Sequence, residues 1–246
     1  MTSLDDLSQP EQYEAAITVL ADVTDVLMDT AKRLGNPDIA VASRCPGWTR
    51  GHVLTHVARN ADALRNLLTW ARTGNETPMY PSSEQRDADI AAGAGRSAAA
   101  HESDVEASAE RFLDDLLALD PEHLGAQVRT GTGAVLVIHD LPYQRAREVV
   151  FHHVDLDAGY GFADAPQALV RRALVETGER LTRQGAGPLV LSASDTGQRV
   201  VVGETADPTD EVTGTAADLL TWASGRGDGS GLSGPAAGLP TLPAWG

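Results

Sequence analysis

The feature that most constrains the fold is a helical spacing of apolar residues that returns several times between residues 10 and 155. Residues 10–34 carry it first, with Pro10 suited to the first turn and Gly35, Asn36 and Pro37 ending the helix. Thr49 can cap a second helix over residues 50–72. The apolar positions of this second helix are Val53, Leu54, Val57, Ala58, Ala61, Leu64, Leu67 and Leu68.

Two further helical regions follow. Residues 83–119 are rich in alanine and are interrupted near residues 93–95, with connections predicted at 74–81 and 121–133. Asp140 can cap a last helix that has Pro142 in its first turn and runs to about Asp155. Four long helices joined by short connections are typical of a helical bundle.

The pattern changes near Asp164. A helix is predicted over 166–184, followed by two β-like runs at 188–194 and 199–203 that a turn at 195–198 joins into a hairpin. A third extended run at 211–214 leads into a helix over 216–224, and the Gly- and Pro-rich tail from Gly225 is expected to be a loop. The predicted fold class is α+β, with a helical bundle over 1–163 and a smaller α/β domain over 164–246.

Net charge and cysteine content limit the partners and the cellular compartment that we expect for this protein. The net charge is −16, from 35 acidic and 19 basic side chains, so a nucleic acid or an anionic membrane surface is a poor partner. An anionic substrate would need a local basic residue. The single cysteine, Cys45, cannot form an internal disulfide. Because the sequence has neither a signal-peptide pattern nor an apolar run of about 20 residues, we expect a cytoplasmic protein.

Three titratable residues suggest a metal site. Glu148 and His152 lie four apart on the last predicted helix of the bundle, so they share one face. His56 on the second helix can complete a set of two histidines and one carboxylate, which is a common open metal site. The ordinary alternative is that Glu148 pairs with Arg145 or Arg147 and that His152 is a partly buried helix histidine. Spacing alone leaves both interpretations open.

Other candidate residues are less well supported by the pattern. His52 competes with His56 as the candidate ligand, although His56 lies on the apolar stripe and should face the bundle core. The two histidines lie four apart, but Val53 stands where the HExxH motif of zinc proteases has its glutamate, so the pair is not that motif. Cys45 precedes Pro46 in a turn and has no evident histidine partner, so we interpret it as a loop thiol without a role. Arg226 can hold a carboxylate bidentately, but the sequence alone favours a solvated tail residue.

These residues resemble a known family. Trp48, the run from His56 to Asn60 and the run from Arg147 to Asp155 resemble the DinB-like four-helix metalloproteins, and most closely the mycothiol-dependent maleylpyruvate isomerases. The run from Thr213 to Arg226 resembles the closing motif of that family's second domain, an α/β module similar to sterol-carrier proteins. The resemblance implies that His56, Glu148 and His152 bind a divalent metal, usually taken as zinc, and that Arg226 helps to hold the substrate. His52 has no role in the family pattern and is kept as a reserve ligand; His52 or His153 is a candidate for proton transfer.

The resemblance also implies an activity. Mycothiol would be the thiol cofactor, and its thiolate would add to the cis double bond of maleylpyruvate, allow rotation and leave again to give fumarylpyruvate. The expected partners are therefore a small anionic substrate and a low-molecular-weight thiol. The alternatives are a mycothiol S-transferase on the same scaffold, a module that binds an apolar ligand around a structural metal, and a regulatory protein. An open three-ligand site argues against the structural metal, because structural zinc usually has four protein ligands.

Overall fold

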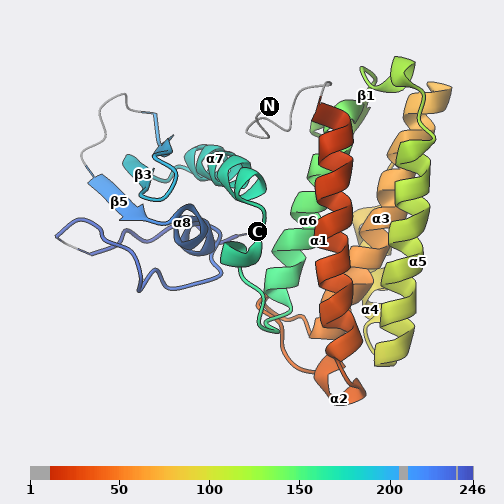
Figure 1. Cartoon of the computed structure of the whole chain (residues 1–246), viewed down its shortest axis with the longest axis horizontal. Coiled ribbons are helices and arrows are strands. Elements are labelled where there is room, and N and C mark those ends of the chain that lie inside the picture. Colours follow the sequence, from red (N-terminus) through yellow and green to blue (C-terminus); the bar gives the residue numbers. More distant parts are fainter. Residues whose placement is uncertain (1–11, 205–209, 237, 246) are drawn as a thin grey trace. The chain divides into compact units, whose positions relative to one another are not determined.

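The computed structural model describes residues 12–204, 210–236 and 238–245. The chain divides into two compact units, Met1–Ala158 and Gly159–Gly246 (Figure 1). Within the described residues, no helix has the combination of length and apolar character that crossing a membrane requires.

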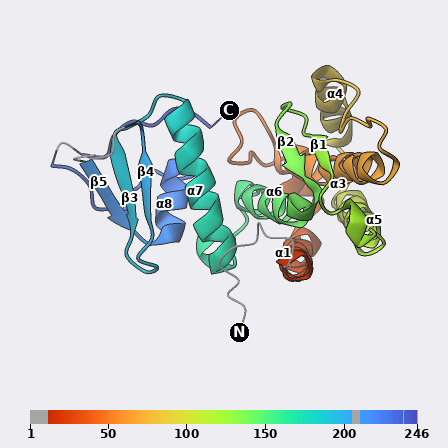
Figure 2. The ribbon, with the colours of Figure 1, turned by 90° about the horizontal axis from the view of Figure 1, so that it is seen from above.

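The N-terminal unit is a four-helix bundle, as its periodicity predicted. Helices α1 (Tyr13–Arg33) and α3 (Arg50–Thr73) each pack against both α5 (Ala98–Leu117) and α6 (Leu141–Asp155) (Figures 1 and 2). The apolar stripes of the four helices form one buried core, in which Leu27, Leu67, Phe112 and Val149 are at most 1% exposed. Thr49 is the N-cap residue of α3, where the sequence placed it.

Short elements between these helices escaped the sequence pattern. The residues predicted to end the first helix, 35–37, also begin a one-turn helix, α2 (Asn36–Ile39). The predicted break after residue 93 separates α4 (Ser83–Gly93) from α5. The connection predicted at 121–133 contains a strand, β1 (Gln127–Arg129), which pairs antiparallel with β2 (Val135–Val137). Strands of three residues are too short to show an alternation of apolar and polar side chains.

Two close contacts fix the start of α3, the helix that carries His56. A Cβ atom at Gly51 would collide with the carbonyl oxygen of Ala94, so only glycine allows α3 to approach the end of α4 this closely. Arg50 donates from Nε to the carbonyl oxygen of Leu156 and from Nη2 to that of Asp157, at 2.6 Å each. These carbonyls lie just beyond the C-terminus of α6, where a cation is electrostatically favoured. Arg50 thus ties the start of α3 to the end of α6.

The C-terminal unit is a small sheet with helices on one face. The predicted hairpin is β3 (Leu189–Ala193) and β4 (Arg199–Val202), and the predicted third run is β5 (Asp210–Gly214). The strand order is β4–β3–β5, with β3 antiparallel to β4 and parallel to β5. Helices α7 (Gln167–Arg183) and α8 (Ala216–Ala223) cover the same face of this sheet (Figure 2). The two units together give the α+β class predicted from the sequence.

Candidate metal centre

His56, Glu148 and His152 meet inside the bundle. Helix α3 supplies His56, and α6 supplies the other two from successive turns. The Nε2 atom of His56 lies 3.5 Å from Oε2 of Glu148, and Nε2 of His152 lies 3.6 Å from the same oxygen. Ligands held at about 2.0–2.2 Å in a tetrahedral arrangement are separated by about 3.3–3.6 Å. The ligand atoms of the three residues all lie within 4.8 Å of one another, and the two distances to Glu148 suit a divalent metal such as zinc.

The protonation of two of these groups already suits metal binding. Burial lowers the pKa of His56 to about 4, and His152 and Arg86 act in the same direction, so this imidazole is neutral at neutral pH. Burial alone would raise the pKa of Glu148, but hydrogen bonds and charge from His152 and His56 outweigh it and hold the pKa well below its usual value. A neutral imidazole and an ionised carboxylate are the ligand forms a metal requires.

Asp155 and Cys45 surround the outer side of His152. Nδ1 of His152 is 3.0 Å from Oδ2 of Asp155, whose side chain is 1% exposed. Burial would lower the pKa of His152, but its hydrogen bonds with Asp155, Cys45 and Glu148 together hold it well above the usual value. Asp155 thus orients the ring so that Nε2 faces Glu148, as carboxylates do for metal-bound histidines. The thiol of Cys45 has a histidine neighbour after all, which the sequence could not show because Cys45 is about 100 residues away from His152 along the chain.

His52 occupies a different position from His56. Its Nδ1 accepts the backbone N–H of Thr49 at 3.2 Å and lies 2.9 Å from the Thr49 hydroxyl, so it completes the cap of α3. The Trp48 ring stacks on His52 at 6.2 Å between ring centroids and lies tilted against His56 at 5.5 Å. Among the described residues, the candidate metal-holding groups include His56 and leave out His52. His52 remains a candidate for proton transfer through its other nitrogen.

His153 points to another part of the bundle. It is 1% exposed, and its Nε2 lies 2.8 Å from the Thr30 hydroxyl of α1. Its neighbour along the chain, His152, faces α3 instead, because adjacent residues on a helix project about 100° apart. The structure thus separates the two adjacent histidines into different environments.

Sequence reasoning missed two residues near the centre, Arg86 and Tyr80, and named Arg145 only as a possible partner of Glu148. Arg86 on α4 places Nη2 3.4 Å from Nδ1 of His56, and the Tyr80 ring centroid lies 6.0 Å from the Arg86 guanidinium carbon. Arg145 is 1% exposed and donates from Nη1 to Oδ1 of Asn60 at 2.8 Å. Burial lowers the pKa of Arg145 to about 10, so it stays positive one helical turn before Glu148. No motif or spacing in the sequence marks Arg86 or Tyr80, because Arg86 reaches His56, and Tyr80 reaches Arg86, only in the folded chain.

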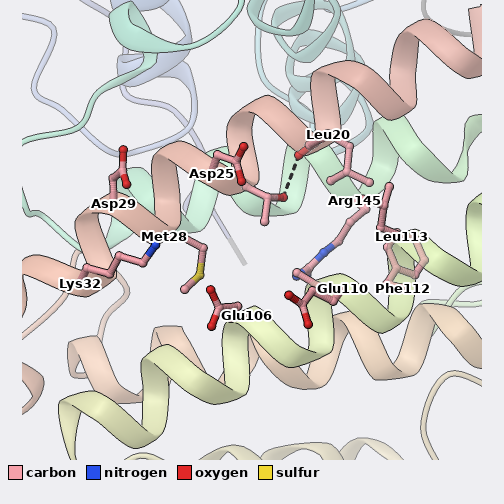
Figure 3. Close-up of a pocket in the computed structure, with 13 residues that line it drawn as sticks. Leu20, Asp25, Met28, Asp29, Lys32, Glu106, Glu110, Phe112, Leu113 and Arg145 are labelled. Atoms are coloured by element: carbon pink, nitrogen blue, oxygen red, sulfur yellow. Dashed lines mark hydrogen bonds between the residues drawn. The ribbon is translucent and has the colours of Figure 1, made fainter.

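A pocket elsewhere in the bundle is distinct from this centre. It has a volume of about 420 Å³ and lies between α1 and α5 (Figure 3). Its walls carry the carboxylates of Asp25, Asp29, Glu106 and Glu110, and Arg145 reaches into it. None of His56, Glu148 and His152 lines this pocket.

Arg226 lies in the C-terminal unit, just past α8. It is 8% exposed, so the interpretation as a solvated tail residue is wrong. Gly225, with φ of +73°, ends α8 in the left-handed conformation and turns the chain back. The Arg226 guanidinium carbon lies 5.1 Å from the Trp245 ring centroid, and that of Arg180 lies 3.8 Å from the same ring. Two cations therefore share one indole ring, a contact between residues too far apart in the sequence to be foreseen.

Comparison with known proteins identifies the family. Residues 20–157 match the family model described as the mycothiol maleylpyruvate isomerase N-terminal domain, which is more than half of the chain. The chain belongs to the mycothiol maleylpyruvate isomerase family. A crystal structure of the mycothiol-dependent maleylpyruvate isomerase is 32% identical, with a TM-score of 0.90 and 100% of each chain covered. A histidine-to-alanine mutant of that enzyme matches with the same identity, coverage and TM-score. No curated protein is significantly similar in sequence.

Membership of the isomerase family agrees with the resemblance seen in the sequence motifs. The matched residues of the family model include Trp48, His56, Glu148 and His152. The crystal structures extend the similarity to the C-terminal unit, which contains Arg226.

Proposed function

We propose that this protein is a mycothiol-dependent cis–trans isomerase that converts maleylpyruvate to fumarylpyruvate, with a divalent metal, zinc in the first instance, held by His56, Glu148 and His152. The observation that carries the proposal is the convergence of two Nε2 atoms on Oε2 of Glu148 at 3.5 and 3.6 Å. The membership of the family supports the reaction and the thiol.

Three protein ligands leave a coordination position open for a reactant. A metal bound there would lower the pKa of a coordinated thiol and so supply the reactive thiolate. The protein's own thiol, Cys45, lies beside the outer face of His152, so the nucleophile in this proposal comes from the cofactor.

The surrounding residues hold the site in shape. Asp155 lies against Nδ1 of His152 and orients its ring, and the Trp48 ring packs against His56. Arg226 is proposed to hold a carboxylate of the substrate, since its planar guanidinium can bind a carboxylate through two parallel hydrogen bonds. For His52 we propose proton transfer at Nε2, because Nδ1 accepts a hydrogen bond from the cap and the remaining proton of the neutral ring is then on Nε2.

The test compares metal content and turnover in matched variants. Maleylpyruvate is supplied with and without mycothiol, and the fumarylpyruvate formed is measured for the wild type, His56→Ala, Glu148→Ala and His123→Ala. We expect turnover that requires mycothiol, and loss of both metal and turnover in the first two variants. His123→Ala, which removes a histidine from the 3-10 helix after α5, should keep both.

Two results would change the proposal. Metal binding without isomerisation, together with stable thiol conjugates of electrophiles, would identify an S-transferase on the same scaffold. Full turnover in His56→Ala and Glu148→Ala would remove the metal centre from the mechanism.

A further inference from the structure

The two histidines of the metal centre differ in what their outer nitrogens face. Nδ1 of His152 faces the carboxylate of Asp155, which is the usual partner of a metal-bound histidine. Nδ1 of His56 faces Nη2 of Arg86 at 3.4 Å, and no carboxylate or carbonyl among the described residues bonds to it. The ring of His56 therefore lacks the kind of acceptor that its counterpart has.

Metal binding at His56 would change the contact between Nδ1 and Arg86 from a hydrogen bond into a contact between two donors. While Nε2 of the neutral ring donates to the Glu148 carboxylate, Nδ1 accepts from Arg86; a metal bound at Nε2 would take the lone pair there and leave the hydrogen on Nδ1. A guanidinium nitrogen has hydrogens and no lone pair to accept with. The two N–H groups therefore cannot bond to each other, and an acceptor that meets both would satisfy both.

Arg86 is suited to hold an anion beside the metal centre. Its side chain is 31% exposed, so it reaches from solvent to the buried His56 ring. Nη1 is paired at 2.7 Å with Asp87, but that carboxylate is 67% exposed and the pair contributes little. The Tyr80 ring lies 6.0 Å from the guanidinium carbon, near the limit of a cation–π contact, and flanks the side chain.

We propose that Arg86 and the Nδ1–H of His56 bind one carboxylate of the anionic substrate, making Arg86 a substrate-binding residue of the N-terminal unit. This inference rests on the proposed function. A carboxylate oxygen accepts from several donors, and hydrogen bonds between charged groups are the strong ones. A protein of net charge −16 needs such a local cation to attract a dianion.

The test measures anion binding by calorimetry on the zinc-loaded full-length protein. The probe is maleate, a stable cis-dicarboxylate, and the variants are Arg86→Gln, Arg86→Lys and Arg72→Gln. We expect Arg86→Gln to weaken maleate binding about 10- to 100-fold while its zinc content stays at the wild-type level. The maleate affinity of Arg86→Lys should lie between those of the wild type and Arg86→Gln, because lysine keeps the positive charge but lacks the planar guanidinium.

Arg72→Gln is the matched control. It removes the same charge from α3 at a position 16 residues beyond His56, about 24 Å along the helix, and should bind maleate like the wild type. With maleylpyruvate as substrate, Arg86→Gln should raise KM by a similar factor and change kcat less.

The proposal is overturned if Arg86→Gln binds maleate within twofold of the wild type, or if the wild type does not bind maleate; an ordered water is then the shared acceptor. A failure of the proposed isomerase function would give a different result from a failure of the anion site. A wild type that binds maleate through Arg86 but forms no fumarylpyruvate would keep the anion site and reject the isomerase.

Discussion

At the scale of single residues, the orientation of His152 depends on its neighbour one turn later. Oδ2 of Asp155 lies 3.0 Å from Nδ1 and Oε2 of Glu148 lies 3.6 Å from Nε2, so the buried Asp155 carboxylate favours the proton on Nδ1 and leaves Nε2 facing Glu148. The side chain of Asp155 is 1% exposed, so solvent does not screen this contact.

Asp155→Asn should weaken metal binding by about 10- to 100-fold, because the amide keeps the shape of the carboxylate but removes its charge. The dissociation constant for zinc, measured by competition with a chelator, checks this. Asp157→Asn is the control, since Asp157 is 54% exposed and pairs with Arg44 at the surface. Equal zinc affinities in the two variants would show that Asp155 does not support the ligand.

At the scale of elements, the metal centre depends on how closely α3 approaches its neighbours. Gly51 lets α3 meet the end of α4, and Arg50 joins α3 to the end of α6. Both contacts lie within two turns of His56 on α3. The packing of these helix ends therefore positions the ligands that come from different helices.

Gly51→Ala should lower the free energy of unfolding by about 1–3 kcal/mol, because the added methyl group meets the Ala94 carbonyl. Helix propensity alone would favour alanine here by about 1 kcal/mol, so the sign of the change identifies the collision. Urea unfolding measures it. Gly125→Ala, at an exposed glycine with open space around its Cβ, should change stability by less than about 0.5 kcal/mol; the same loss in both variants would refute the collision.

At the scale of the whole molecule, the proposed metal ligands all belong to one of the two compact units. Metal binding should therefore stabilise residues 12–158 directly. At a free metal concentration 100 times the dissociation constant, the gain is about 2.7 kcal/mol. Hydrogen exchange should show added protection in α3 and α6, compared with α7 and β3.

The stabilisation that metal binding gives should also increase with pH through the neutral range. The pKa of His152 is held well above 6.5, so the metal-free folded protein carries a proton there that metal must displace. Glu148 is already ionised and His56, with its pKa near 4, is already neutral. Affinity therefore rises with pH until the raised pKa of His152 is passed. A stabilisation that falls from pH 6 to pH 8, or protection confined to residues 159–245, would contradict this.

The sequence by itself determined what depends on near neighbours in the chain. Helical periodicity set the four bundle helices, a turn between two β-like runs set the hairpin of β3 and β4, and a spacing of four put Glu148 and His152 on one face. These features follow from 3.6 residues per turn and from turn chemistry, which act over a few residues. The apolar stripe likewise predicted that His56 would face the core, where it is 4% exposed.

Only the tertiary structure decided which groups meet across elements. It placed His56 rather than His52 beside Glu148, brought Cys45 to His152 and Arg86 to His56, and buried Arg226, which the sequence alone favoured as a solvated residue. It also revealed the pairing of β1 with β2, whose three-residue strands are too short for a periodic signal. The physical reason is that helix periodicity fixes the face on which a side chain lies, whereas its partner depends on how closely and at what register two helices pack.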